Sequence, residues 1–405
     1  MASRAREALP RSPGERSAAI PSDMRPPRRR VSVRRVLTTT AFTAGLVILA
    51  GILVYNIDQN LAARGLSLTF EFLGRPAGFD IPFKAVEFSP RDTYADAALV
   101  GIVNTLLVSA MAVVTATILG FVGGAALLST NPLLARIALG VVELIRNTPQ
   151  LLQILFFYTV MLRTLPAARD SLALGGLVFL NVRGLFLPAV AAGPAPMPSL
   201  VFSADQWFWI LVLAGLVSLV VPLTARQRIA LGGLTLSAAI ALAIFLFTSG
   251  ALRLDPPALR GFNFRGGTQI VPEFVALWIG LAVYASAFIA DLVRGAVLSV
   301  PRGQEEAASA LGLSPAQVLW LVRIPQALRI LVPPLVSQYL NVIKSSTLGL
   351  AIAYPEIMAV VAGTTLNQTG HAIETMLIVM LFFLALNLII SLLINLYNRR
   401  LVRRG

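Results

Sequence analysis

The stretch that decides the fold is PRGQEEAASALGLSPAQVLWLVRIP, residues 301–325, which lies between two strongly apolar segments. Its first half is rich in good helix formers, and Gly312 stands where a left-handed residue commonly ends a helix. An N-cap, a first-turn proline and a capping-box glutamine then begin a second helix, which Pro325 is expected to end or kink. The stretch therefore predicts a compact, bent helical hairpin. The residues that begin its second helix are Ser314, Pro315 and Gln317.

Outside this stretch, the composition indicates a membrane protein. Of the 405 residues, 57% are hydrophobic and 13% are charged, whereas ordinary globular chains have roughly 45–50% and about 25%. A helix needs about 20 apolar residues to cross the hydrocarbon core of a bilayer. Such segments predict an all-α, polytopic membrane protein with about eight transmembrane helices, and they exclude a soluble enzyme. The segments are residues 36–57, 98–128, 133–162, 207–222, 229–249, 270–290, 335–362 and 373–397.

Several chemistries are excluded by residues that the sequence lacks. Cysteine is absent and His371 is the sole histidine, so no metal site of the thiolate or multi-histidine type is expected. Lys344 precedes a serine, but Ile343 stands where the phosphate-binding loop of an ATPase requires glycine. The chain is therefore expected not to be an enzyme and to hold no cofactor of its own.

Positive charge gathers at the two ends of the chain, whose net charge is +14. Residues 1–35 hold ten arginines, and residues 398–405 hold four. Basic residues favour the cytoplasmic side of a membrane, so eight spans place both termini and residues 301–325 in the cytoplasm. The 1–35 tail is expected to be disordered, and residues 58–97 to form an ordered extracytoplasmic cap.

The hairpin stretch resembles the coupling loop of bacterial ABC import permeases. That pattern is Glu-Ala-Ala, three residues, Gly, nine residues, and then an aliphatic residue, any residue, an aliphatic residue and Pro. The resemblance implies that the hairpin docks in a groove of a cytoplasmic ATPase, which binds ATP and Mg²⁺, and transmits its closure. The matching residues are Glu306, Ala307, Ala308, Gly312, Val322, Ile324 and Pro325.

Four further stretches resemble the polar amino acid uptake permeases, with Asn147 in place of a glycine and Asp291 in place of a glutamate. They are residues 100–109, 143–153, 287–295 and 344–348. The resemblance implies a five-span permease core in residues 98–163 and 270–400. The additions are the 1–35 tail, an extra first span with a periplasmic loop (36–97), and periplasmic loops with two extra spans (164–269). This arrangement resembles the larger permease subunit of general L-amino acid transporters (the AapQ and BztB type).

The resemblance implies a function and a set of partners. The chain would be the permease subunit of an ATP-driven, binding-protein-dependent L-amino acid importer in a bacterial inner membrane. A second homologous permease subunit would form the other half of the translocation pathway. Two ATPase subunits would drive alternating access, and a periplasmic amino-acid-binding protein would deliver the substrate.

The third apolar segment carries a polar stripe that is a candidate translocation path. Its members recur at offsets of three and four residues, and ionisable residues within a membrane usually face the interior of the bundle. An alternative stays open, in which Glu143 and Arg146 pair with each other and only join helices. The path candidates are Glu143, Arg146, Asn147, Gln150 and Gln153, together with Glu356 in the seventh segment.

Three further pairs of polar residues are expected to be structural or to line the path. One pair should bond between helices, one should form an ion pair near the hairpin, and one should snorkel and hydrogen-bond locally. In that order they are Asn104 and Thr105, Asp291 and Arg294, and Lys344 and Thr347. His371, in a short loop, is interpreted as solvated and is given no role.

Two alternative functions use the same sequence differently. An ion-coupled secondary transporter needs no ATPase but commonly shows inverted repeats, and none is visible here. A membrane-tethered helix-turn-helix protein would explain Ala308, Gly312 and Val318 as the packing and turn residues of a DNA-binding motif. Its second helix would carry only Arg323 as a charge, so no nucleic-acid partner is expected.

Overall fold

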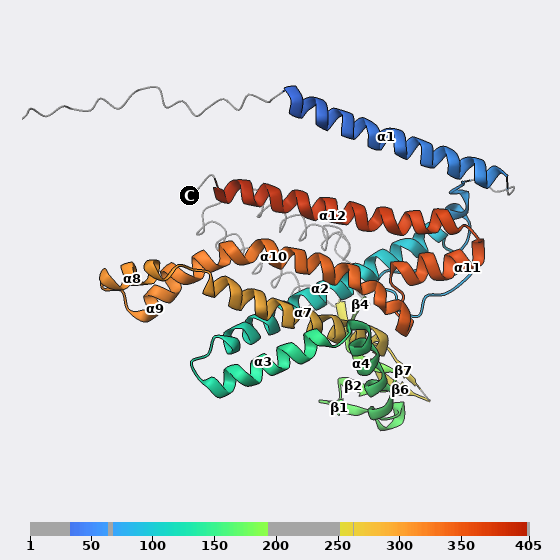
Figure 1. Ribbon diagram of the computed structural model, residues 1–405. Coiled ribbons are helices and arrows are strands. Elements are labelled where there is room, and N and C mark those ends of the chain that lie inside the picture. The colour runs from blue at the N-terminus through green and yellow to red at the C-terminus, as the bar shows by residue number, and fades with distance from the viewer. Residues whose placement is uncertain (1–32, 64–67, 193–251, 262, 403–405) are drawn as a thin grey trace, which may run out of the picture. The chain divides into compact units, whose positions relative to one another are not determined.

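The computed structural model describes residues 33–63, 68–192, 252–261 and 263–402 (Figure 1). The chain divides into two units, residues 1–68 and 69–405. In the first unit, α1 (Val33–Ala62) covers the expected first apolar segment. The expected spans 207–222 and 229–249, and nearly all of the arginine-rich tail, lie outside the described residues.

Four helical stretches of the described residues are long and apolar enough to cross a membrane. They are α2 (Tyr94–Leu127), α7 (Pro272–Leu298), a run from Pro315 to Ile352, and the Ala372–Leu392 part of α12 (Ala372–Val402). The second unit is therefore mainly helical, as the composition predicts. The expectation of about eight spans is met only in part by the described residues.

The third apolar segment is not one helix. It forms α3 (Pro132–Asn147) and α4 (Gln150–Thr164), which are separated at Thr148 and Pro149. Thr148 is extended, with ψ 128°, because a following proline ring disfavours the helical conformation of the residue before it. A continuous span over 133–162 is therefore wrong, because the helix breaks at Thr148 and Pro149.

The hairpin leads into a long helical run without interruption at Pro325. After α8 (Arg302–Ala310), the run passes through α9 (Pro315–Gln317), the π-helical turn η3 (Val318–Arg323) and α10 (Ile324–Ser345). Pro325 is the second residue of α10, so the second helix does not end at Pro325. The wider π-helical turn before it relieves the clash that a proline ring makes with the preceding turn.

The expected seventh span, 335–362, is also divided. The 3₁₀ turn η4 (Ser346–Ile352) continues α10 and ends at Ala353, which has φ 59°. An extended stretch leads to the π-helical η5 (Met358–Thr365) and to α11 (Leu366–Thr369). Buried backbone that leaves a helix needs other partners for its N–H groups, and α2 supplies one of them, as described below.

Short strands occupy the connection between α4 and α7, so an all-α fold is incomplete as a description. After η2 (Ala168–Asp170), the strands form three separate antiparallel sheets. One has four strands in the order β1-β2-β3-β8, and the other two are the pairs β4-β5 and β6-β7. Rings of Phe186 and Phe264 lie 4.7 Å apart between two of these layers. The strands are β1 (Leu172–Leu174), β2 (Val178–Asn181), β3 (Gly184–Leu187), β4 (Ala189–Ala192), β5 (Leu252–Asp255), β6 (Ala258–Arg260), β7 (Asn263–Arg265) and β8 (Thr268–Ile270).

The core of the second unit is the contact between α2 and α7. Small residues on α2 let the two backbones approach, as is common where membrane helices pack. A Cβ atom added to Gly120 would lie 2.5 Å from Ile289, and one added to Gly124 would lie 2.6 Å from Val293. On the other side of α7, Gly280 leaves the same kind of space for Ile154 of α4.

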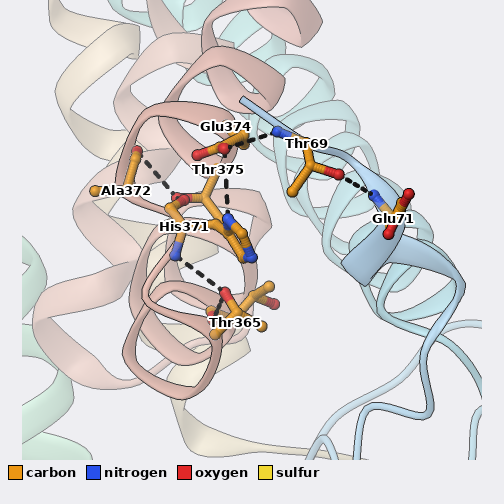
Figure 2. A network of polar contacts seen from close by, with 8 residues as sticks. Thr69, Glu71, Thr365, His371, Ala372, Glu374 and Thr375 are labelled. Atoms are coloured by element: carbon orange, nitrogen blue, oxygen red, sulfur yellow. Dashed lines mark hydrogen bonds and ion pairs between the residues drawn. The ribbon is translucent and has the colours of Figure 1, made fainter. Parts of the chain in front are cut away.

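The segment before α2, residues 69–93, contacts the start of α12 through hydrogen bonding and ring stacking. Near η1 (Glu71–Gly74), Thr69 donates its backbone N–H to Glu374 Oε1 at 3.1 Å (Figure 2). His371 Nδ1 lies 3.4 Å from the same oxygen, and its ring stacks on Phe72 at 4.7 Å. His371 is half-buried, so its interpretation as a solvated loop residue is wrong.

The α2–α7 contact generates a stability prediction. Gly120→Val should lower the melting temperature of the purified protein by roughly 5 °C, because overpacking costs about 1–3 kcal/mol. The melting temperature can be measured by fluorescence-detected gel filtration of heated, detergent-solubilised samples. Gly140→Ala on α3 is the control, because an added Cβ there meets nothing within 4 Å. Equal melting temperatures for the Gly120 variant and the wild type would contradict the packing account.

Candidate functional site

The hairpin of α8 and α9 has the geometry that its sequence predicts. Gly312 adopts φ 84°, a left-handed conformation, and Leu313 donates its N–H back to Ala308 O at 3.3 Å. This bond closes a helix C-terminus whose carbonyls would otherwise lack partners. The second helix begins with a complete capping box, in which the Ser314 and Gln317 side chains each accept a backbone N–H from the other residue.

Two polar contacts and two buried side chains hold the hairpin in a fixed shape at the end of α7. Glu305 of α8 pairs with Arg323 of η3 at 3.1 Å, and Arg323 Nε also lies 3.5 Å from Val297 O of α7. Ala308 and Val318 are buried. The hairpin is thus a preformed unit, tied to α7 by a charged side chain and continuous with α10.

The outer face of the hairpin is exposed and apolar. Leu311 is 82% exposed, Trp320 67% and Leu321 65%. Glu306 and Ala307 of α8 are exposed as well. Large apolar side chains with such exposure mark a surface that contacts another protein or the membrane. The described residues place no protein segment over them.

The C-terminal half of α7 carries an ion pair that differs from the two pairings considered from the sequence. Arg146 Nη1 of α3 bonds Asp291 Oδ2 of α7, and the guanidinium also lies 5.1 Å from the centre of the Phe288 ring. Within the described residues, Glu143 is exposed without an ion-pair partner, and Arg294 does not pair with Asp291. The expected Asp291–Arg294 pair is therefore wrong, and the alternative in which Glu143 and Arg146 pair with each other is not observed, because Asp291 bonds Arg146.

A cavity of about 460 Å³ opens beside this ion pair. Its walls come from α3, α7 and α10, and they combine both charges with an aromatic ring and with hydroxyl and amide groups. Pockets of this size with few polar groups on an apolar wall suit small polar ligands. The lining residues are Arg146, Phe288, Asp291, Leu292, Pro334, Ser337 and Gln338.

The remainder of the predicted polar stripe is dispersed by the break between α3 and α4. Gln153 is buried, and its Nε2 donates to Ile145 O at 2.8 Å and to Thr148 O at 3.1 Å. It therefore satisfies carbonyls that the broken helix leaves open. Asn147 ends α3 and Gln150 begins α4, so the prediction of one polar stripe with helical offsets of three and four residues is wrong.

Glu356 is fully buried, and both of its oxygens are engaged. Oε2 accepts from Met358 N at 2.7 Å and Oε1 from Ala359 N at 2.8 Å, so the carboxylate caps the start of η5. This arrangement gives Glu356 a structural role at a helix N-terminus.

Asn104 of α2 bonds two connecting segments rather than another helix, whereas Thr105 bonds the N-cap residue at which η5 begins, so the predicted bonds between helices are met by Thr105 alone of the two. Asn104 Nδ2 donates to Pro355 O and to Phe83 O, each at 2.9 Å, and Thr105 Oγ1 accepts from Ile357 N at 3.0 Å. They supply partners for the non-helical backbone before η5. The local bond expected for Thr347 is also present, from its Oγ1 to Lys344 O at 2.8 Å.

Comparisons with known proteins agree with this architecture. Residues 116–403 match the family described as binding-protein-dependent transport system inner membrane component. The putative amino-acid ABC transporter permease protein YhdX of Escherichia coli is 42% identical, over 91% of this chain and 94% of that protein. The general L-amino acid transport system permease protein AapQ of Rhizobium johnstonii is 40% identical, over 88% and 90%. The glutamate/glutamine/aspartate/asparagine transport system permease protein BztB of Rhodobacter capsulatus is 36% identical, over 90% and 92%.

The chain therefore belongs to the family of binding-protein-dependent inner membrane permeases, within its polar amino acid ABC transporter branch. It is a multi-pass inner membrane permease component of an ABC transporter and is not itself an ATPase, as the coupling-loop resemblance implied. Membership of such a system implies an ATPase partner, which binds ATP, and a binding-protein partner. The secondary-transporter and DNA-binding alternatives are set aside by this membership.

The Arg146–Asp291 pair generates a prediction about coupling between α3 and α7. Arg146→Ala and Asp291→Ala should each lower the stability of the purified protein, and the double variant should lose less than the sum, because each single change strands a partly buried charge. A double-mutant cycle of melting temperatures measures this coupling. Glu143→Ala is the control on α3 and should be neutral. Strict additivity of the two changes would contradict the pairing.

Proposed function

We propose that this chain forms half of the translocation pathway of an ATP-driven L-amino acid importer. The observation that carries the proposal is the preformed, exposed hairpin of α8 and α9, at one end of a bundle that holds a charged cavity. The names of the relatives AapQ and BztB support L-amino acids as the substrate class. A second, homologous permease subunit completes the pathway, and a periplasmic binding protein delivers the amino acid.

The hairpin is the site at which two ATPase subunits, one on each permease, act on the membrane helices. Glu306 and Ala307 contact the ATPase, since both are exposed on α8. Ala308, Gly312 and Pro325 fix the shape and the base of the hairpin. Closure of the ATPase pair then moves a rigid body that is bonded to α7, and the bundle changes between inward-facing and outward-facing packings.

The orientation that supports this mechanism places the hairpin and both termini in the cytoplasm. The arginines of residues 1–35 and 398–405 support it through their preference for the cytoplasmic side. The strands β1–β8 and residues 69–93 then lie on the periplasmic side. The permease core corresponds to residues 98–163 and 270–400, and residues 36–97 and 164–269 are additions to it.

The cavity beside Arg146 and Asp291 is the part of the pathway that this subunit contributes. A guanidinium attracts the α-carboxylate of an amino acid, and a carboxylate attracts its ammonium group. Ser337 and Gln338 on α10 add hydrogen-bonding groups to the same wall. Because α10 continues into the hairpin, a movement of the hairpin changes the shape of this cavity.

A charge reversal on the hairpin tests the proposal. Glu306→Lys should leave membrane insertion and assembly intact, because Glu306 is exposed, and should reduce ATP-driven amino acid uptake at least tenfold. Uptake is measured in proteoliposomes that contain the complete transporter. Gln304→Lys is the control, because it also introduces a lysine on α8, at a position two residues away on a different face of the helix. Normal uptake by a correctly assembled Glu306→Lys transporter would contradict the proposed coupling role.

A further inference from the structure

A second cavity, of about 350 Å³, shares no lining residue with the cavity beside Arg146. Residues 79–82, before α2, form one wall, and residues between 350 and 367 form the other. Both walls belong to the second unit, and Asn104 and Thr105 bond this region to α2. The cavity combines apolar surface from Phe79, Leu350 and Val360 with polar groups of Asp80, Thr364 and Asn367.

This cavity opens at the end of the bundle that is remote from the hairpin. Asn367 lies on α11, and Figure 1 shows α11 at the opposite end of the second unit from α8 and α9. In the proposed orientation, that end faces the periplasm. A solute released by a binding protein therefore reaches this cavity before it reaches the cavity beside Arg146.

One carboxylate oxygen is left available at the cavity wall. Asp80 Oδ1 accepts from Lys84 Nζ at 2.8 Å and from Ile81 N at 2.9 Å, whereas Oδ2 accepts no hydrogen bond from the described residues. Lys84 is itself held by Phe88 O at 2.7 Å. The Lys84 hydrogen bond lowers the pKa of Asp80, so the carboxylate is ionised at neutral pH. Asp80 is also the one ionisable residue among those that line the cavity.

The opposite wall offers hydrogen-bond donors. The Asn367 side chain makes no hydrogen bond with the described residues, and the Thr364 hydroxyl has only a 3.5 Å bond to Ala359 O. Ala353, which also lines the cavity, has φ 59°. Backbone held in this left-handed conformation costs energy in a residue with a Cβ and often marks a binding region.

We propose that this cavity is an entry site for a free L-amino acid. The ammonium group binds Asp80 Oδ2, the α-carboxylate binds the Asn367 amide and the Thr364 hydroxyl, and the side chain lies over Phe79 and Leu350. Lys84 pairs with Asp80 Oδ1 but does not line the cavity. The lining thus offers one carboxylate oxygen and two neutral donors on an apolar wall, a set that suits a zwitterion. The inference rests on the proposed function and adds a second substrate-binding site to the same pathway.

Cysteine labelling tests the entry site directly, because the chain has no cysteine of its own. Gly363→Cys places one thiol in the cavity wall, where an added Cβ has no neighbour closer than 3.7 Å. The complete transporter is reconstituted in proteoliposomes without binding protein and treated with a membrane-impermeant maleimide. Labelling of this chain is followed by its mass shift, with L-glutamine as the protecting probe.

L-Glutamine should slow the labelling, and N-acetyl-L-glutamine, which lacks the ammonium group, should not. Adding Asp80→Asn should raise the L-glutamine concentration needed for protection about fivefold, since an exposed ion pair contributes up to about 1 kcal/mol. Glu87→Gln is the matched control, because Glu87 is exposed in the same segment and does not line the cavity. The comparison of the two glutamine probes is made on the Gly363→Cys transporter and does not depend on the Asp80 variant folding.

Two results would overturn the entry site. One is equal labelling with and without L-glutamine, and the other is equal protection by both glutamine probes. ATP-driven uptake is measured in parallel with binding protein present. Uptake without protection overturns the entry site alone, whereas the absence of uptake overturns the proposed function.

Discussion

The close approach of α2 to α7 is the constraint on which the rest of the structure depends. Lipid offers no hydrophobic driving force between helices, so their association relies on packing and on a few polar bonds. Gly120 and Gly124 provide the space for Ile289 and Val293. Once α7 is fixed, it binds α4 through Gly280, α3 through the Asp291 ion pair, and the hairpin through Val297 O.

In this arrangement α10 connects the hairpin, where the ATPase is proposed to bind, with the cavity where the substrate is proposed to pass. The hairpin is rigid because its two short helices are capped, joined by a left-handed glycine and crossed by the Glu305–Arg323 pair. It is also continuous with α10, which lines the cavity beside Arg146. A force applied to the exposed face of α8 therefore reaches the cavity wall without passing through a flexible loop.

Local sequence signals predicted the hairpin well, because caps, a turn glycine and a first-turn proline act within a few residues. Gly312 and the Ser314 capping box occupy the expected conformations. The predictions that failed depended on longer-range geometry. Periodicity continues through Thr148 and Pro149, so a broken helix looks like one span, and the partner of Arg146 is 145 residues away. The strands between α4 and α7 are three or four residues long, too short for alternation to reveal.

Polar residues in apolar segments were the least predictable, because burial alone does not distinguish a ligand from a helix cap. Glu356 and Gln153 both satisfy backbone groups at helix breaks, and neither break is visible in the apolar pattern. Sequence order also concealed the role of His371, since Phe72 and Thr69 are remote along the chain.

The central claim is that the exposed face of α8 contacts an ATPase. Its most direct test replaces Ala307 with the photoreactive residue p-benzoylphenylalanine in the full chain and irradiates the native membrane. The account predicts a covalent adduct whose second polypeptide is an ATP-binding subunit, with a yield that changes when ATP is added. The claim would be contradicted if membranes with p-benzoylphenylalanine at position 307 transported amino acids but gave no adduct with an ATP-binding polypeptide.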